Sequence, residues 1–356
     1  MLVFSRSLLI KVFLFAFATL FLAYCASQTT QNTVTPADLN LPKGFTPPPV
    51  TKLTGVGTNS QATLSPKGNL MAFISEMRPN HENPQIYILD LGSGEERRVT
   101  YQDGVTSHVT FSPDGRRIVY SSTTDEAKED SNFIKESLEK LTGKERKEEK
   151  PTFFWENQPT EIYSSFINGS RIERLTHIKH YDAEATIDPK DHSIIFVSAR
   201  DKFLNLHVMS TTGVYLKKLT FSKTPKAQPV LSPNGQYLAW VEYNNDFTSA
   251  HIFVGNASAK KPKQITSGEG IHFQPTWLPD NQTLIFSSNR DDKSNYELYS
   301  IKRDGSCLQR LTWHTGNETE PSASKSGNDY VFTSDRSGEK QIYKSTYKTA
   351  EECNNI

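Results

Sequence analysis

The chain has 356 residues, and its 40 Lys and Arg balance its 40 Asp and Glu, so the formal net charge is zero. This balance argues against a dedicated nucleic-acid binder, which needs a basic surface. The apolar share of 35% is low for a globular protein, which indicates thin sheets, long turns and a charged insertion.

The N-terminus has the pattern of an export signal. Arg6 and Lys11 supply positive charge beside an apolar run over residues 12–23. This run is short for a membrane span. The segment from Phe21 to Cys25 resembles a bacterial lipobox, although Tyr24 stands where a small residue is usual. We predict a lipoprotein-type signal over 1–25 with Cys25 lipidated; simple cleavage after Cys25 or Ala26 stays open.

A flexible tether is expected over residues 26–49, because this segment is rich in Thr, Gln, Asn and Pro and has little to bury. With a lipid on Cys25, the tether would lift the following domain off a membrane surface.

Six related turns follow, separated by 47, 76, 44, 46 and 46 residues. A period of this length built from short strands is typical of one four-stranded propeller blade. Proline presets φ in such turns, and Gly or Asn tolerates positive φ, so tight hairpins form. The turns are Ser65-Pro66-Lys67-Gly68, Ser112-Pro113-Asp114-Gly115, Asp188-Pro189-Lys190-Asp191, Ser232-Pro233-Asn234-Gly235, Leu278-Pro279-Asp280-Asn281 and Ser324-Lys325-Ser326-Gly327.

Each repeat but the last ends in an apolar residue followed by Thr, and a sixth such pair, Leu53-Thr54, precedes the first turn. We therefore predict an all-β, six-bladed β-propeller over 50–347, closed by an N-terminal strand that completes the last blade. Closure would leave no open sheet edge in the ring. The other pairs are Val99-Thr100, Leu175-Thr176, Leu219-Thr220, Ile265-Thr266 and Leu311-Thr312.

The long interval between the second and third turns holds a charged insertion at 126–150. Ile134, Leu138 and Leu141 share one helical face, so a short helix is expected in the second blade, either a solvated helix packed on the ring or a partner-binding arm. A tail is expected over 348–356. Cys307 and Cys353 either form a disulfide, which export permits, or stay as free thiols.

The repeats resemble the PD40 or WD40-like repeat of the TolB-type propeller family. The resemblance rests on Phe111 to Gly115 with Ile118 to Ser121, on Ser287 to Asp291 with Leu298-Tyr299, and on Thr333 to Arg336 with Ile342-Tyr343. It covers roughly residues 50–347 and implies a six-bladed ring that binds an envelope protein across one face. TolB carries an α/β domain before its propeller, which has no counterpart here, so the contact with TolA is not expected to carry over.

No catalytic signature is present: we find no Gly-x-Ser-x-Gly, His-Glu-x-x-His, Cys-x-x-Cys or P-loop. His177, His180 and Asp182 form a weak candidate for a metal site, because His with carboxylate suits zinc or manganese. Turns are commonly rich in such residues, so we predict no metal and no cofactor at this cluster.

One polar residue recurs five positions before each turn proline or its equivalent. Because the innermost strands line a propeller's channel, the six residues are expected to form a polar ring at one channel mouth. The ring could bind a cation, a water cluster or a partner's basic group, or it could simply be wet. Its members are Gln61, His108, Glu184, Gln228, Gln274 and Glu320.

We therefore expect a non-enzymatic, monomeric protein of the periplasm or outer membrane. It would bind an envelope protein or peptide, touch the membrane only through its lipid anchor, and bind no nucleic acid. The contact face would consist of the loops that precede the innermost strands. The alternatives are a metal-dependent polysaccharide lyase or hydrolase with its site at the channel mouth, and a structural scaffold. The candidate loops are 55–59, 104–108, 177–184, 221–228, 268–274 and 313–320.

Overall fold

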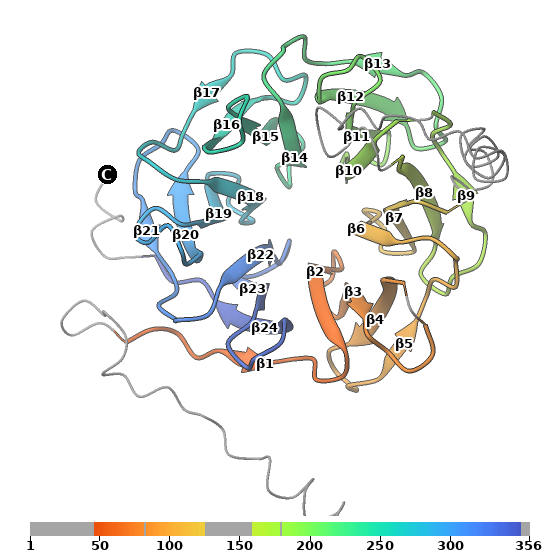
Figure 1. Ribbon diagram of the computed structural model, residues 1–356, viewed down its shortest axis with the longest axis horizontal. Coiled ribbons are helices and arrows are strands. Elements are labelled where there is room, and N and C mark those ends of the chain that lie inside the picture. Colours follow the sequence, from red (N-terminus) through yellow and green to blue (C-terminus); the bar gives the residue numbers. More distant parts are fainter. Residues whose placement is uncertain (1–45, 82, 125–158, 179, 350–356) are drawn as a thin grey trace, which may run out of the picture. The chain divides into compact units, whose positions relative to one another are not determined.

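A computed structural model of the chain describes residues 46–81, 83–124, 159–178 and 180–349, all within one compact unit. These residues form six four-stranded antiparallel sheets arranged around a central axis (Figure 1). The described part of the chain contains no helix, and none of its segments has the helical length and apolarity needed to cross a membrane. The six-bladed propeller predicted from the repeats is confirmed.

Within each sheet the strands follow the chain from the axis outward. The first three sheets are β2 (Thr58–Leu64), β3 (Leu70–Glu76), β4 (Gln85–Asp90) and β5 (Glu96–Arg98); β6 (Thr106–Phe111), β7 (Arg117–Ser122), β8 (Glu161–Phe166) and β9 (Glu173–Arg174); and β10 (Asp182–Ile187), β11 (Ser193–Ser198), β12 (Asn205–Ser210) and β13 (Lys217–Lys218).

The remaining sheets repeat this order, except that the last one takes its outermost strand from the N-terminal side of the chain. They are β14 (Lys226–Leu231), β15 (Tyr237–Tyr243), β16 (Ala250–Asn256) and β17 (Lys263–Gln264); β18 (His272–Trp277), β19 (Thr283–Ser288), β20 (Glu297–Lys302) and β21 (Gln309–Arg310); and β22 (Glu318–Ala323), β23 (Asp329–Ser334), β24 (Gln341–Thr346) and β1 (Thr51–Lys52).

The ring closes through β1, which lies antiparallel to β24 with Thr51 opposite Lys344. Leu53 N–H donates to the carbonyl of Ile342 at 2.8 Å, and Ile342 N–H donates back to the hydroxyl of Thr54 at 2.9 Å. The N-terminal strand therefore occupies the outer position that the sixth Leu-Thr pair indicates.

The same two-bond clasp explains every closing pair. In each sheet the apolar residue of the closing pair donates its N–H to the backbone carbonyl of the second residue of the third strand, or of the equivalent residue. The N–H of that same residue donates to the Thr hydroxyl at 2.8–2.9 Å. A Thr is needed because its hydroxyl satisfies a backbone N–H that is buried where the short outer strand ends. The Thr residues and their partners are Thr54 with Ile342, Thr100 with Ile86, Thr176 with Ile162, Thr220 with Leu206, Thr266 with Ile252 and Thr312 with Leu298.

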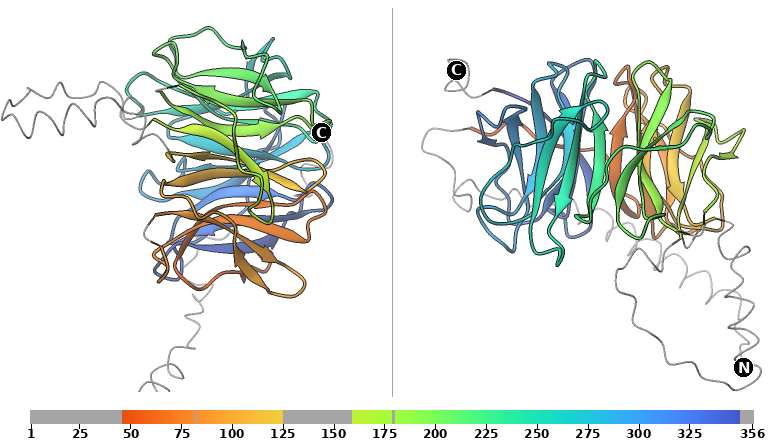
Figure 2. Two further views of the ribbon diagram at one scale, coloured as in Figure 1. Left: turned by 90° about the vertical axis from the view of Figure 1, so that its right-hand side faces the viewer. Right: turned by 90° about the horizontal axis from the view of Figure 1, so that it is seen from above.

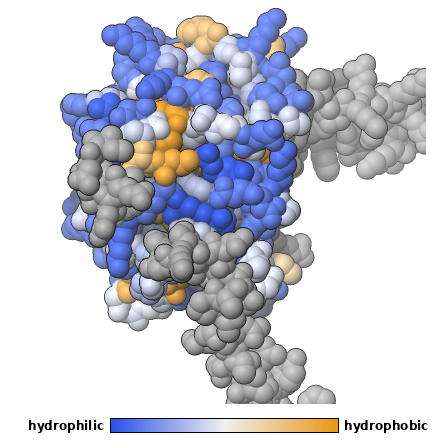
Figure 3. Space-filling view, turned by 90° about the vertical axis from the view of Figure 1, so that its left-hand side faces the viewer, coloured by the Kyte–Doolittle hydropathy of each residue, from blue (hydrophilic) through white to orange (hydrophobic). Residues whose placement is uncertain are grey.

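The hydrophobic core lies between neighbouring sheets. Trp240 of β15 is almost fully buried and packs into a cluster with Leu204 and Leu206 of the preceding sheet. Each sheet thus covers the face of the next, because one twisted four-stranded sheet cannot bury both of its faces alone. Figure 2 shows the ring from two sides, and Figure 3 shows that the side of the ring on the left of Figure 1 is mostly hydrophilic, with one apolar patch near the centre of the view.

Antiparallel order divides the ends of the strands between two faces of the ring. We call loop face the side that carries the loops entering each innermost strand and the loops from second to third strands. We call turn face the opposite side, which carries the six repeated turns and the hairpins from third to fourth strands. The six candidate loops therefore share the loop face.

The predicted signal, Cys25, nearly all of the tether and the helical insertion at 126–150 lie outside the described residues. Cys307 is a described residue and forms a disulfide. The other two cysteines of the chain, Cys25 and Cys353, lie outside the described residues.

Candidate functional site

The six polar residues predicted to form a ring occupy one equivalent position, near the middle of each innermost strand. At this position the pairing with the second strand shifts by a β-bulge in every sheet. All six residues have a left-handed backbone, with φ between 51° and 58°. This conformation is uncommon without glycine, and a bulge redirects the side chain that it carries. The residues are Gln61, His108, Glu184, Gln228, Gln274 and Glu320.

The ring residues are joined from sheet to sheet by a belt of hydrogen bonds. The side-chain oxygen of one ring residue accepts the backbone N–H of the ring residue in the next sheet. Glu320 accepts from Gln61 at 2.8 Å, and Gln274 accepts from Glu320 at 2.8 Å. The remaining links join Gln61 to His108 at 2.7 Å, Glu184 to Gln228 at 2.5 Å and Gln228 to Gln274 at 2.7 Å.

The belt changes at one point, between the second and third sheets. His108 places its Nδ1 3.0 Å from the hydroxyl of Ser107, and Ser121 of β7 accepts the N–H of Glu184 in its place at 3.3 Å. The other oxygen of Glu184 accepts the hydroxyl of Tyr181 at 3.0 Å. Polarity at this position therefore has a structural role, since it satisfies the N–H of a strained bulge residue.

The ring residues line a cavity of about 220 Å³ along the axis of the propeller. Glu184 and Glu320 are the carboxylates among its lining residues. They belong to the third and sixth sheets, so the sixfold order places them on opposite sides of the axis (Figure 1). Two carboxylates surrounded by Gln and His side chains form an anionic, hydrogen-bonding site for one positively charged group.

The weak metal candidates are not brought together. Asp182 is buried at the start of β10 and pairs with Arg200 at 2.6 Å, whereas His177 and His180 are exposed. Among the residues that the structure describes, no three His, Cys, Asp or Glu side chains are arranged to hold a metal ion.

A second set of polar residues, not identified from the sequence, forms hydrogen bonds with the backbone of the loops on the loop face. Each of these residues is buried at the start of a third strand, where its side chain contacts the backbone of the loop that follows the closing Thr. Gln85 donates to the carbonyls of Gln102 and Gly104 at 3.0 and 3.2 Å. Glu297 accepts the N–H of His314 at 2.6 Å. Equivalent contacts come from Glu161 to Ile178, from Asn205 to Ser222 and from Gln341 to Gly57.

A periodic signal for these loop supports is present in the sequence. In all six repeats a polar residue directly precedes the Ile or Leu that the clasp binds, and a burial pattern based on apolar residues alone overlooks it. The six residues are Gln85, Glu161, Asn205, His251, Glu297 and Gln341.

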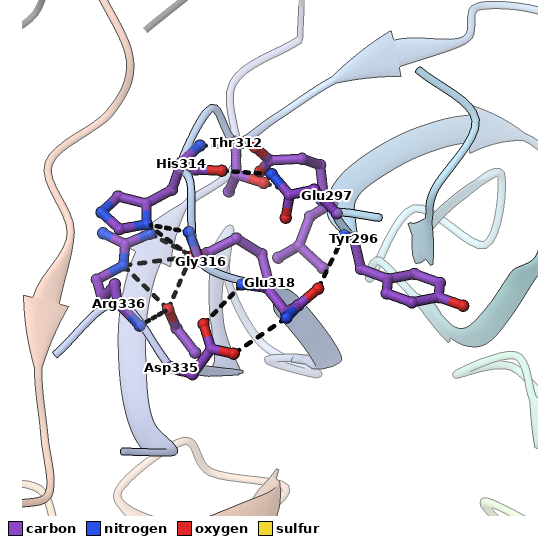
Figure 4. A network of polar contacts seen from close by, with 12 residues as sticks. Tyr296, Glu297, Thr312, His314, Gly316, Glu318, Asp335 and Arg336 are labelled. Atoms are coloured by element: carbon purple, nitrogen blue, oxygen red, sulfur yellow. Dashed lines mark hydrogen bonds and ion pairs between the residues drawn. The ribbon is translucent and has the colours of Figure 1, made fainter. Parts of the chain in front are cut away.

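Between the fifth and sixth sheets, the loop support extends into a buried charged network, shown in Figure 4. Glu318 is fully buried and binds Arg336 at 2.7 Å and the hydroxyl of Ser334 at 2.7 Å. His314 Nδ1 accepts the N–H of Gly316 at 2.8 Å, and Asp335 accepts the N–H of Asn317 at 2.7 Å. The whole segment 314–318 is therefore fixed by polar contacts.

The network predicts a pH dependence of stability. Burial raises the pKa of Glu318 to about 8, although Arg336 opposes the shift. The folded state then holds a proton that the unfolded state releases near its ordinary pKa of about 4.3. Stability from this group is therefore lost as pH rises from about 5 to 8. We expect Glu318→Gln, which cannot ionise, to gain at least ~1 kcal/mol relative to wild type over this range, measured by urea unfolding.

The exposed Glu339 supplies the matched control. Glu339→Gln should follow the wild-type pH profile. Parallel profiles for Glu318→Gln and wild type would contradict the buried, proton-holding carboxyl.

Comparison with known proteins supports the family resemblance. Residues 201–352 match the family model PD40, described as TolB beta propeller domain. A relative named Protein TolB homolog, from Chlorobium luteolum, is 27% identical over 154 residues, which are 42% of this chain and 33% of the relative. The chain therefore spans about a third of the length of this curated relative.

Solved structures share the fold. TolB from Acinetobacter baumannii superimposes with a TM-score of 0.56 at 19% identity, covering 77% of this chain and 57% of that protein. An oligogalacturonate lyase from Vibrio parahaemolyticus gives a TM-score of 0.53 at 15% identity, covering 85% of this chain and 96% of the lyase. Identities this low establish the fold alone.

Proposed function

We propose that this chain, which carries a TolB-type six-bladed propeller, is an exported envelope protein that binds another protein or peptide on its loop face and catalyses no reaction. The observation that carries the proposal is the set of buried loop supports. Gln85, Glu297 and their equivalents hydrogen-bond the backbone of five of the six loops that enter the innermost strands.

Rigid loops suit a binding surface. A loop that is already fixed loses little conformational entropy when a partner binds, so more of the contact energy appears as affinity. The loop face also displays exposed aromatic residues beside cations: Arg98 lies 4.4 Å from the ring centre of Tyr101, and Lys218 lies 5.2 Å from that of Phe221. Aromatic side chains of this kind commonly anchor protein partners.

The negative charge of the channel would select a partner that presents a cationic group. Glu184 and Glu320 lie on opposite sides of the axis and are positioned by the belt, with His108 and the three Gln residues completing the ring. A Lys, an Arg or an N-terminal ammonium of the partner would find two carboxylates there. The group that enters is part of the partner, so no resident cofactor is required; a free cation in the channel would use the same oxygens.

The envelope location is part of the proposal; the export-type N-terminal sequence and the similarity to relatives named Protein TolB homolog support it. Lipidation at Cys25 would anchor the monomeric protein in the periplasm or at the outer membrane, with 26–49 as the tether. Mass spectrometry of the mature N-terminus tests the anchor: diacylated Cys25 is expected, and an unmodified terminus downstream of Cys25 would refute it.

The loop face is tested with surface variants that leave the core intact. Envelope proteins captured by the purified chain are identified and their affinities measured. Tyr101→Ala with Phe221→Ala is expected to weaken binding at least tenfold, because both aromatic rings are exposed on the loop face. Tyr215→Ala, on the turn face, is the matched control. Equal loss in all variants, or loss in none, would remove the loop face from the proposal.

The channel is tested by replacing its charge without changing its shape. Glu184→Gln with Glu320→Gln keeps the oxygen that accepts the neighbouring N–H, as Gln61, Gln228 and Gln274 already do in their own sheets. We expect unchanged thermal unfolding and at least tenfold weaker partner binding, because two carboxylates lose their attraction for a cationic group. Undiminished affinity would show that the partner does not use the channel carboxylates.

The competing hypothesis of a metal-dependent polysaccharide lyase has a separate readout. Elemental analysis of the purified protein, combined with an assay for release of unsaturated oligosaccharides, should detect neither a stoichiometric transition metal nor product. A tightly bound metal accompanied by product release would replace the binding proposal with an enzymatic one.

A further inference from the structure

The hairpin between β12 and β13 projects an apolar tip from the turn face. Val214, Tyr215 and Leu216 follow one another in the chain, and all three are classed among the exposed large hydrophobic residues. Tyr215 is 90% exposed, and its neighbours are almost half exposed. Three consecutive apolar side chains in water are a departure from the mostly hydrophilic surface of a soluble protein.

The fold itself does not require this apolar tip. Tyr215 has the same left-handed backbone as Arg171 and Lys261, which occupy the equivalent hairpin position in the neighbouring sheets. At the position of Leu216, exposed apolar residues also occur in the second and fifth sheets, as Ile172 and Leu308, whereas the first sheet has Glu96 and the fourth has Pro262. At the positions of Val214 and Tyr215 the second sheet carries Ser170 and Arg171, and the fourth carries Lys260 and Lys261. The same turn therefore forms with polar residues, and the run of three apolar side chains at 214–216 needs a different explanation.

Exposed lysines lie on this hairpin and on the corresponding hairpin of the next sheet. Lys217 follows the tip directly, and Lys260 and Lys261 stand on the hairpin of the next sheet; all three are exposed and form no ion pair with another described residue. Ala259 of that hairpin and Leu219 of the third sheet pack against the same hydrophobic cluster, and the two hairpins belong to neighbouring sheets of the ring (Figure 1).

The two hairpins carry no acidic residue. Their sequences, 211–217 and 257–263, contain four lysines, the fourth being Lys263, which donates to the carbonyl of Asp304 at 2.6 Å. The chain has a net charge of zero, but these two hairpins carry four positive charges and no negative one. Apolar exposure and positive charge are therefore concentrated in the same pair of hairpins.

We propose that this rim of the turn face, residues 214–217 with Lys260 and Lys261, docks on the surface of an anionic lipid bilayer. Val214 and Leu216 would enter the boundary between headgroups and acyl chains, and Tyr215 would keep its hydroxyl at the polar level. The lysines would bind lipid phosphates. This contact is independent of the loop face and of the proposed partner, and it adds to any lipid on Cys25.

The combination of the two chemistries favours a bilayer over other anionic ligands. An acidic polysaccharide would be attracted by the lysines but would give Val214 and Leu216 no apolar environment. A bilayer interface accommodates both, because amphipathic side chains such as Tyr and Lys place their apolar parts below their polar ends. Each Lys close to an anionic surface contributes about a fivefold gain in binding.

The proposal is tested by sedimentation of the full-length chain with phosphatidylcholine vesicles, with and without phosphatidylglycerol. Binding is expected to require phosphatidylglycerol and to weaken with salt. Tyr215→Ser with Leu216→Ser should weaken it about tenfold through lost apolar burial, and Lys260→Gln with Lys261→Gln should weaken it about fivefold per lysine. All four residues are exposed, so thermal unfolding should not change.

Two controls locate the effect. Lys67→Gln removes an exposed lysine from the turn face of the first sheet, and Tyr101→Ser removes an exposed aromatic residue from the loop face; both should bind vesicles as wild type does. Every variant has the same N-terminus, so equal binding by all of them would assign the contact to the N-terminal segment and overturn the proposal. Loss in the lysine variant alone would also overturn it, in favour of a purely electrostatic ligand.

Discussion

A chain shortened to begin at Gly55 is expected to lose at least about 5 kcal/mol of its free energy of unfolding. It lacks β1, the N–H of Leu53 that donates to Ile342, and the hydroxyl of Thr54 that satisfies the N–H of Ile342. It also lacks Val50 and Leu53, which pack against two core clusters. Each hydrogen bond is worth about 1 kcal/mol, an unsatisfied buried N–H costs about 1–3 kcal/mol, and each apolar side chain adds about 1–2 kcal/mol.

The matched control is a chain that begins at Thr46, which keeps the whole strand and both clasp residues. Both truncations are purified under the same oxidising conditions and compared by urea unfolding, with the slope recorded as well as the midpoint. The control should unfold as the parent protein does. Because a typical domain has only about 5–15 kcal/mol of stability in total, the chain that begins at Gly55 should lose most of its cooperative transition. Similar curves for the two truncations would show that the ring does not depend on closure by β1.

Breaking the belt at Gln274 is expected to have the second largest effect. Gln274→Leu has a similar volume but removes the oxygen that accepts the N–H of Glu320 at 2.8 Å and the hydroxyl of Ser287 at 3.0 Å. The N–H of Glu320 belongs to a left-handed bulge residue, so no strand partner replaces the lost bond. We expect a loss of about 2–3 kcal/mol, measured by chemical unfolding.

Gln274→Glu distinguishes the hydrogen bond from the shape of the side chain. Its carboxylate still accepts the N–H of Glu320, as Glu184 accepts that of Gln228 in another sheet. Its stability should therefore stay within about 1 kcal/mol of the parent, the remaining difference coming from a third negative charge in the channel. If Leu and Glu at position 274 destabilise equally, the belt does not contribute to stability and the polarity of the ring belongs to ligand binding alone.

The periodic spacing in the sequence identified the six ring residues, and the structure adds the hydrogen bonds that join them. The even spacing of these residues from the turns predicted a ring at one channel mouth; the six residues instead lie near the middle of the innermost strands, where they line one cavity. Spacing alone did not reveal the belt, because the belt depends on left-handed bulges that turn each N–H toward the previous sheet. Binding of a cationic group at Glu184 and Glu320 stays a prediction.

The loop supports show the opposite case. A polar residue before the Ile or Leu of each third strand is visible in the sequence, but nothing in the sequence distinguishes Gln85 and Glu297 from exposed residues at a strand end. Their burial follows from the packing of one sheet against the next, which covers them and leaves the backbone of a loop as their hydrogen-bonding partner.

The sequence by itself determined the number of blades, the position of every turn and the origin of the closing strand, because these depend on local signals: a Pro-Gly type turn, a short apolar run and an apolar-Thr pair repeated at a constant interval. The tertiary structure decided which polar residues are buried, which ones lie on opposite sides of the axis and which apolar residues remain exposed to solvent. Those properties arise only when six sheets are brought together around one axis, since burial and pairing of a side chain belong to the neighbouring sheet as much as to its own.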